Sequence, residues 1–197
     1  MFPLSKARTI ADSVVTKLQP YCEIVLIAGS IRREKVEVKD IEIVCVPKRV
    51  LKGGMDLFGE DTRSTVVHPD FEKTVRQLGQ VVKGRPDGRM MNIVLAQKIQ
   101  LDLFMPQPID FWRQFAIRTG SKEFTHRVLA DRWYKNGWCG TEDGLRLQRE
   151  CEATVKEGKT TWKCVADKPT LPPIWSSEKE FFEWLGVTYV HPKFRTV

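Results

Sequence analysis

The sequence predicts an α+β fold, with a strand-rich first part followed by a smaller part of mixed helices and strands. Before residue 106, short apolar runs with strand-like character outnumber helical stripes, and tight turns link several of them. Pro106 and Pro108 then interrupt the pattern and indicate a boundary. We therefore expect two domains, residues 1–106 and 107–197.

The first domain is expected to begin with a helix over residues 5–19 that ends at Pro20. Its apolar stripe consists of Ala7, Ile10, Ala11, Val14 and Leu18. Residues 23–28 are interpreted as a buried strand that leads into a turn at Gly29 and Ser30. After a second strand, residues 48–67 are expected to form a loop, because glycines lie there among charged residues.

Pro69 suits the start of a helix that runs to about Leu78. Strands over residues 80–84 and 89–95 flank a Pro86-Asp87-Gly88 turn. A tight connection at residues 96–98 leads into a last strand. The first domain is therefore expected to be a mixed sheet with two flanking helices.

The second domain is expected to contain helices over residues 109–118 and 121–136, with Gly137 suited to the cap after the second. Residues 138–175 look like short strands with a polar KEGKTT connection. A final helix is predicted over residues 177–185.

Residues 28–46, AGSIRREKVEVKDIEIVCV, contain the strongest chemical signal. Because alternate side chains of a strand share a face, Asp40 and Glu42 would project together, and Ile41 and Ile43 would face the other way. Two adjacent carboxylates repel each other unless a cation or a proton lies between them. The Gly-Ser turn upstream can bring backbone N–H groups to a phosphate, and Arg33 adds positive charge.

Asp102 supplies a third carboxylate in the apolar segment IQLDLFM. Three acids on adjacent strands could hold two Mg²⁺ ions about 3.5–4 Å apart, an arrangement that serves in-line displacement at phosphorus. An isolated D-x-E is more often a solvated pair on an edge strand. The Gly-Ser turn before it and the apolar run after it favour a nucleotidyl-transfer site.

These residues resemble family X DNA polymerases, the group that includes DNA polymerase β. Gly29-Ser30, Arg32-Arg33 and Asp40-x-Glu42 follow the order and spacing of that family's nucleotidyltransferase motif. Later segments also resemble the family: Thr119-Gly120-Ser121 with Phe124, Gly144-Leu145, and Ser177–Phe182 followed by Leu185-Gly186, Tyr189, Pro192 and Arg195. The resemblance extends from about residue 5 to the C-terminus.

The resemblance implies a nucleotidyltransferase palm over 1–106 and a thumb-like nucleotide- and DNA-binding domain over 107–197. The helical lyase domain and first DNA-binding helical domain of longer members are expected to be missing, as in the short viral members. By resemblance, Asp40 and Glu42 bind both Mg²⁺ ions, with Mn²⁺ as an alternative ion. Asp102 binds the catalytic ion and helps to activate the primer 3′-hydroxyl.

The implied nucleotide contacts are Gly29, Ser30, Arg33 and Lys39 for the phosphates, and Ile117, Arg118, Gly120 and Ser121 in the second domain. Several positions depart from the family pattern, and four of them are predicted metal or nucleotide contacts. Glu42 replaces the usual Asp, Lys39 replaces Gly, and Ile117-Arg118 replaces an aromatic pair beside the incoming sugar. We therefore expect a weaker preference for dNTP over rNTP. The resemblance also implies a cis peptide between Gly120 and Ser121.

Lys122, His126, Arg127 and Arg132 are candidate contacts with DNA or nucleotide, although a solvated helix face explains them equally well. Phe124, Trp112, Trp133 and Trp138 could stack on bases, but core packing is the preferred interpretation for at least three of them.

The expected activity is template-directed DNA synthesis, used to fill short gaps in DNA repair. The expected partners are DNA and dNTP, and the protein is expected to be a monomer. A template-independent transferase, or one acting on a small molecule or tRNA, is the first alternative. The short 96–98 connection argues against the terminal-transferase branch, which has a long loop there. The second alternative is a non-catalytic DNA-binding subunit, in which three bare carboxylates would repel DNA.

The composition is that of an ordinary globular protein, with 42% hydrophobic and 29% charged residues. The net charge of +7 favours a polyanionic partner. No apolar run approaches the roughly 20 residues that span a bilayer, and Met1–Thr9 lacks the apolar core of a signal peptide. The expected location is the cytoplasm, or the nucleus in a eukaryote.

The five scattered cysteines argue against a disulfide framework and favour a reducing compartment. Cys139, Cys151 and Cys164 could form a zinc site with His126. Without a C-x-x-C pair, ordinary packing is the preferred interpretation.

Overall fold

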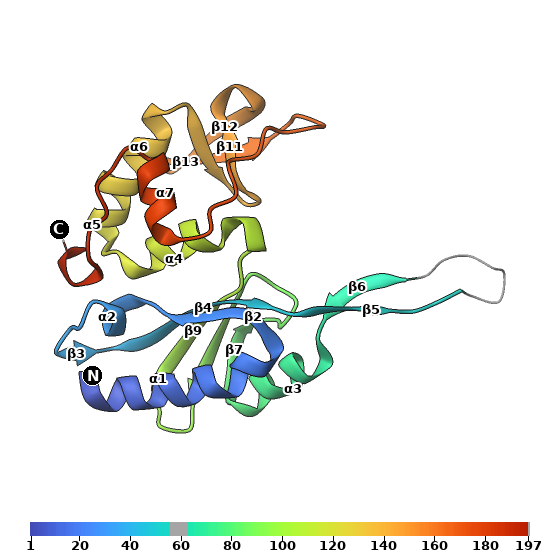
Figure 1. The fold of residues 1–197 in the computed structure, drawn as a ribbon, viewed down its shortest axis with the longest axis vertical. Helices are drawn as coiled ribbons and strands as arrows, with labels where there is room; N and C mark the ends of the chain where they lie inside the picture. Colours follow the sequence, from blue (N-terminus) through green and yellow to red (C-terminus); the bar gives the residue numbers. More distant parts are fainter. Residues whose placement is uncertain (56–62, 197) are drawn as a thin grey trace. The chain divides into compact units, whose positions relative to one another are not determined.

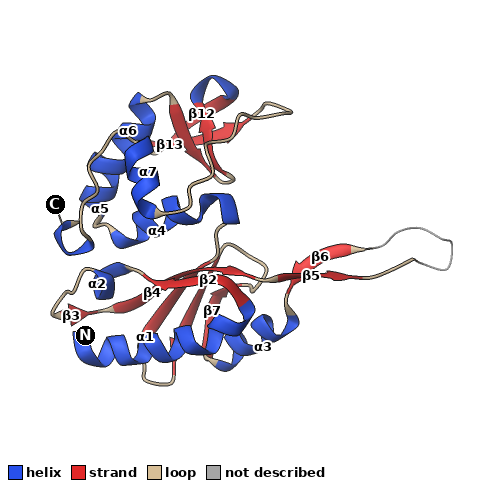
Figure 2. Ribbon diagram, in the orientation of Figure 1, coloured by secondary structure: helices blue, strands red, loops and turns tan. Residues whose placement is uncertain are grey.

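The computed structural model describes residues 1–55 and 63–196. The chain is an α+β protein that divides into two compact units, Met1–Pro106 and Gln107–Val197. Figures 1 and 2 show a sheet with flanking helices in each unit. The described residues include no helix long and apolar enough to cross a membrane.

The first unit is built on a five-stranded sheet in the order β2-β4-β9-β8-β7. The strands are β2 (Cys22–Ile27), β4 (Asp40–Pro47), β7 (Gly79–Gly84), β8 (Met90–Leu95) and β9 (Gln100–Phe104). β4 and β9 are parallel and the other neighbours are antiparallel, so the sheet is mixed. Both β4 and β9 are interior strands.

Two helices cover one face of this sheet, α1 (Leu4–Leu18) and α3 (Pro69–Gln77) (Figure 1). The predicted stripe of α1 is buried, and it belongs to the same core cluster as Ile41 and Ile43 of β4 and Phe71 of α3. Pro69 occupies the first turn of α3, where a missing N–H costs nothing. The predictions of these helices and of the five strands are confirmed.

Shorter elements complete the first unit. Residues Gln19–Tyr21 form a 3₁₀ turn, and the expected Gly-Ser turn is the start of a four-residue helix, α2 (Gly29–Arg32). β1 (Phe2–Pro3) pairs with β3 (Glu37–Val38). The tight connection before β9 is confirmed: Lys98 has φ +62°, and Leu95 N donates to Ile99 O at 3.0 Å.

The prediction of a loop over residues 48–67 is wrong for most of its described part. β5 (Arg49–Lys52) and β6 (Ser64–Val67) form an antiparallel hairpin that projects from the sheet (Figure 1). The glycines and charges of this segment concealed a pairing of β-branched residues, in which Val50 lies opposite Val66. Residues 56–62, including Gly59, lie outside the described residues.

The second unit begins with the 3₁₀ turn Pro108–Asp110 and α4 (Phe111–Thr119). The predicted helix over 121–136 is present but changes its winding: α5 (Lys122–Phe124) and α6 (Asp131–Lys135) flank a π-helical segment, Thr125–Ala130. Gly137 follows the last turn with φ +81°, as its capping role requires. The final helix, α7 (Glu178–Trp184), is confirmed.

A four-stranded sheet in the order β11-β10-β13-β12 completes the second unit. Its strands are β10 (Trp138–Thr141), β11 (Gly144–Leu147), β12 (Cys151–Lys156) and β13 (Lys159–Cys164). The KEGKTT segment is not a connection as expected, because only Glu157 and Gly158 lie in the turn and the strands include the rest. Strand structure ends at Cys164, and residues 165–175 contain none.

The second unit has its own, mainly aromatic core. Phe124, Trp133, Trp175, Phe181 and Phe182 are buried in one cluster. Trp112 and Trp138 pack against this cluster from its margin. Core packing is therefore confirmed as the main environment of Phe124 and Trp133, and it also accounts for Trp112 and Trp138.

Candidate active site

The three acids predicted as metal ligands lie on neighbouring strands in the middle of the first sheet. In the parallel β4–β9 pair, Glu42 is the register partner of Asp102, and Asp40 is the register partner of Gln100. The intervening residues Ile41 and Leu101 are fully buried on the helix-covered face. Side-chain alternation therefore places all three carboxylates on the opposite face.

This placement removes the alternative of a solvated pair on an edge strand. Asp40, Glu42 and Asp102 are each only partly exposed, on strands with hydrogen-bonded neighbours on both sides. Partial burial raises the pKa of Asp40, and the negative charge of Asp102 raises it further. Lys39, a backbone hydrogen bond and Arg33 act in the opposite direction. Negative charge accumulates here without full compensation, which favours the binding of a cation.

Asp102 is held in place by two amide side chains. Asn92 Nδ2 donates to Asp102 Oδ1 at 2.7 Å, and Gln100 Nε2 donates to the same oxygen at 2.6 Å. Asn92 lies directly opposite Asp102 on β8. Sequence analysis missed both amides. Asn92 faces Asp102 across the β8–β9 pair, so its role depends on strand pairing, whereas Gln100 lies two residues before Asp102 on the same face of β9 and could have been found by side-chain alternation. Both donors contact one oxygen, so the other carboxylate oxygen is not used by these two bonds.

Gly29 allows the carboxylate of Glu42 to approach the start of α2. It has φ +62°, and a Cβ at this position would lie 2.0 Å from Glu42 Oε2. Ala28 N donates to Glu42 O at 2.8 Å, which fixes the backbone of this turn to β4. A side chain at residue 29 would therefore collide with a carboxylate and also strain the backbone.

Ser30 and Arg33 lie next to this carboxylate group. Ser30 Oγ is buried and has no hydrogen-bond partner among the described residues. An unsatisfied buried hydroxyl is costly, so a ligand atom at this position would be stabilising. Burial lowers the pKa of Arg33, whereas the charges of Glu42 and Asp40 raise it. Arg33 thus lies within electrostatic range of the acids, and Lys39 is exposed immediately before Asp40.

The donor set fits a hard divalent cation, because Mg²⁺ and Mn²⁺ prefer carboxylate oxygen ligands. The partly buried like charges and the raised pKa of Asp40 agree with such an ion. Even so, residues 1–55 and 63–196 contain no group of three or more His, Cys, Asp or Glu side chains arranged to hold a metal ion. The residue types fit the ion, but the side chains do not form a closed coordination shell.

The second unit contains the remaining predicted nucleotide contacts at the junction of α4 and α5. Ile117 and Arg118 lie in the last turn of α4, and Gly120 caps it. Ser121 caps α5, since its side chain accepts from Phe124 N at 3.1 Å. Ser121 N donates to Arg195 O at 2.9 Å, so the C-terminal segment is bonded directly to this junction.

The prediction of a cis peptide between Gly120 and Ser121 is wrong, since the described residues contain no cis peptide bond. Gly120 has an extended backbone, with φ −69° and ψ 157°. Glycine is needed here for space: a Cβ would lie 2.8 Å from Phe124 Cδ1 and 2.9 Å from Thr125 Oγ1. Thr125 Oγ1 also donates to Ile117 O at 3.1 Å.

The four predicted DNA contacts, Lys122, His126, Arg127 and Arg132, are all exposed on the helical segments that follow Ser121. Exposure is compatible with a phosphate-binding surface and equally with a solvated helix face. Their assignment therefore stays a prediction.

The three cysteines of the second unit come together without His126 contributing to a metal cluster in the described part of the chain. Cys151 and Cys164 are register partners in the β12–β13 hairpin. Burial and hydrogen bonding with Cys139 raise the pKa of Cys151 to about 12, with smaller contributions from Cys164. A raised pKa keeps the Cys151 thiol protonated at neutral pH, which favours packing over metal binding.

Two buried ion pairs were also missed from the sequence. Arg195 donates to Glu178 from Nη1 at 2.6 Å and from Nη2 at 3.0 Å. Arg113 donates to Asp110 from Nε and from Nη2, both at 2.6 Å. Both pairs lie in the second unit. Arg195 joins the C-terminal segment to α7, and Asp110 joins the preceding 3₁₀ turn to α4.

The sequence was also compared with known proteins. No family model matches the chain, and no curated protein matches it.

Proposed function

We propose that this protein is a nucleotidyltransferase that extends a DNA primer, a DNA-directed DNA polymerase that fills short gaps in DNA repair. The observation that carries the proposal is the register of β4 and β9. It aligns Glu42 with Asp102, with Asp40 on the same face, and Glu42 lies against Gly29 at the start of the turn that continues into Ser30. Carboxylates gathered beside a possible phosphate-binding turn are what transfer of a nucleotide group requires.

In the proposed reaction, the primer 3′-oxygen attacks the α-phosphorus of a dNTP, and the bond from that phosphorus to the pyrophosphate oxygen breaks. The hydroxyl proton leaves as the new ester forms. Asp102, fixed by Asn92 and Gln100, is the residue that would orient the hydroxyl and accept its proton. Ser30 Oγ, the adjacent backbone and Arg33 would bind the triphosphate.

Asp40, Glu42 and Asp102 would hold the divalent ions. When bound, Mg²⁺ or Mn²⁺ supplies Lewis-acid stabilisation of the charge that develops on the phosphoryl oxygens. The raised pKa of Asp40 means that bound cations would also keep this carboxyl ionised. In this proposal, residues 1–106 are the palm domain, and residues 107–197 bind nucleotide and DNA through the Ile117–Ser121 junction and the exposed cations after it.

The short connection before β9 favours template-directed synthesis over the template-independent branch, since Lys98 N donates to Leu95 O in a tight turn with no inserted loop. Transfer to a small molecule or to tRNA would use the same carboxylates. A non-catalytic DNA-binding role would leave Asp40, Glu42 and Asp102 repelling the phosphate backbone without any benefit.

The test is primer extension on gapped, recessed and single-stranded DNA, with each dNTP and rNTP and with Mg²⁺, Mn²⁺ or EDTA. We expect metal-dependent addition of the templated nucleotide, with gapped or recessed DNA preferred. Asp102→Asn should abolish the product, and Asp12→Asn, at an exposed position on α1, should not. Untemplated addition would support the alternative transferase, and no product with any substrate would refute the proposal.

A further inference from the structure

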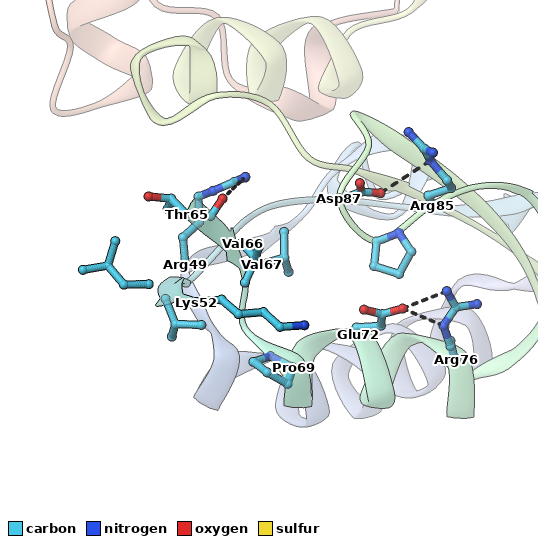
Figure 3. A pocket seen from close by; sticks show the side chains of 13 residues that line it. Arg49, Lys52, Thr65, Val66, Val67, Pro69, Glu72, Arg76, Arg85 and Asp87 are labelled. Carbon is cyan, nitrogen blue, oxygen red and sulfur yellow. Dashed lines mark hydrogen bonds and ion pairs between the residues drawn. The ribbon is translucent and has the colours of Figure 1, made fainter. Parts of the chain in front are cut away.

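The first unit contains a second charged surface, formed by the β5–β6 hairpin, α3 and the turn between β7 and β8. These elements enclose an open cavity of about 630 Å³ (Figure 3). Four cationic side chains line it: Arg49 and Lys52 from β5, Arg76 from α3 and Arg85 from the turn. Two carboxylates, Glu72 and Asp87, also line it.

The two carboxylates are already paired with two of the cations. Arg76 Nη2 lies 2.8 Å from Glu72 Oε1, and Arg85 Nε lies 3.5 Å from Asp87 Oδ1. Arg49 donates to a backbone oxygen, Thr65 O, at 3.3 Å, and Lys52 extends into the cavity (Figure 3). Among the described residues, neither Arg49 nor Lys52 forms an ion pair with a carboxylate. The lining therefore has a net positive charge that comes from β5.

We propose that this hairpin surface binds the sugar-phosphate backbone of duplex DNA. The charged side chains that line the cavity are all exposed, so they can meet phosphates with little loss of hydration. Among the described lining residues no polar side chain is buried, as selection of a small anion would require. Such a surface suits a polyanion held by charge and counterion release rather than by shape. Val66 and Val67, which are partly exposed, supply apolar surface that can lie against deoxyribose.

The position of this surface predicts its role. β4 leads through Lys48 directly into β5, so Arg49 follows Asp40 by one strand length, on the order of 30 Å at the usual rise per residue. Residues this far from the carboxylates cannot stabilise charge at the reacting phosphorus. They can hold flanking duplex, so their loss should raise the KM for DNA and leave kcat unchanged.

The inference rests on the proposed DNA substrate, but it can be tested without any catalytic step. The probe is a fluorescently labelled mixed-sequence DNA duplex, and its anisotropy is measured in EDTA over a range of salt concentrations. Arg49→Gln/Lys52→Gln is compared with wild type and with Lys6→Gln/Lys17→Gln, a control that removes the same charge from exposed positions on α1. Thermal unfolding checks that both variants fold.

We expect the hairpin variant to lose about tenfold or more in affinity at low salt, and its slope of log K against log salt to become shallower by about 1–2. The control should retain nearly wild-type affinity. Equal losses in the two variants, or an unchanged slope in the hairpin variant, would overturn the proposal. Unchanged DNA binding with increased self-association would show that the cations protect the open strand edges instead. DNA binding without primer extension would refute the proposed activity but leave this surface in place.

Discussion

Ionised side chains are arranged in opposite ways in the two units. In the first unit, Asp40, Glu42 and Asp102 share one face of the sheet, and partial burial and mutual repulsion raise the pKa of Asp40. In the second unit, each buried acid has an arginine partner with two hydrogen bonds: Asp110 with Arg113, and Glu178 with Arg195. Buried charge in the second unit is neutralised by direct pairing, whereas charge in the first unit is held at a cost to stability.

The burial of the apolar face of the same strands offsets this loss of stability. Ile41, Ile43, Leu101 and Leu103 are fully buried beneath the carboxylates. Burying each such side chain contributes about 1.5–3 kcal/mol, which together exceeds the repulsion among partly solvated carboxylates. The alternation of β4 and β9 thus joins a stabilising face to a reactive one. Replacing charges in each unit tests this difference.

The largest effect is expected from breaking a buried pair in the second unit. Arg195 is 0% exposed, and Glu178 is 4% exposed. Arg195→Met would leave Glu178 buried without its cation and should destabilise the protein by about 3–5 kcal/mol. Urea unfolding of the full chain measures this change.

The matched variant is Arg195→Met/Glu178→Met, which removes both charges and should recover most of the lost stability. If Arg195→Met alone stayed within about 1 kcal/mol of wild type, the pair would not be a main support of the C-terminal segment.

Neutralising an acid in the first unit should have the opposite effect on stability and a severe effect on activity. Asp102→Asn should reduce primer extension on the order of 10³-fold while leaving the fold as stable or slightly more stable, because one repulsive charge is removed. Binding of Mg²⁺-dNTP should be largely retained. Single-turnover kinetics and fluorescence titration measure these two quantities, and normal turnover would sink the assignment of Asp102.

A smaller loss is expected when Asp102 keeps its charge but loses a positioning contact. Asn92→Ala removes the 2.7 Å hydrogen bond to Asp102 Oδ1 and should lower activity about 10–100-fold, the usual range for a residue that orients a metal ligand. The activity should recover in part at higher Mg²⁺ concentration. Gln114→Ala, which removes an amide contact to Asp110 in the second unit, is the control and should leave activity unchanged.

Features that depend on a short stretch of sequence were predicted, and features that depend on contacts between distant segments were not. The helix α1, the turn at residues 86–88 and the acids of β4 follow from periodicity and turn residues within a short window, and the structure has them. Asn92 could not be identified as a partner of Asp102, because that requires the pairing of β8 with β9. Gln100 is a local neighbour on the same face of β9, and the alternation of that strand could have identified it. The same limit explains Arg195, whose partner Glu178 lies seventeen residues away in the chain.

The prediction of a loop in place of the β5–β6 hairpin was wrong for a different reason. Local propensity was weak there, with Gly53, Gly54 and several charges around short β-branched runs, and pairing of Val50 with Val66 outweighed it. The π-helical segment at Thr125–Ala130 likewise left no clear pattern, since apolar spacing hardly distinguishes a π turn from an α turn. The roles of Ser30 and the other nucleotide contacts stay predictions, because position alone does not test them.

The smallest expected effect is the pH dependence of stability at Asp40. Its pKa is raised in the folded protein, mainly by burial and then by Asp102, so the native state binds this proton more tightly than the unfolded chain does. Ionisation therefore costs stability above the folded pKa, and the cost disappears below the ordinary pKa of aspartate. Asp40→Asn should then be more stable than wild type at pH 7 by less than about 1 kcal/mol, since the group is partly solvated. The gain should shrink to zero as the pH falls through the acidic range. Thermal unfolding in EDTA between pH 7 and pH 4 measures it, with exposed Asp12→Asn as the control. A variant that is less stable than wild type at pH 7 would mean that Asp40 is held by favourable contacts, like the acids of the second unit.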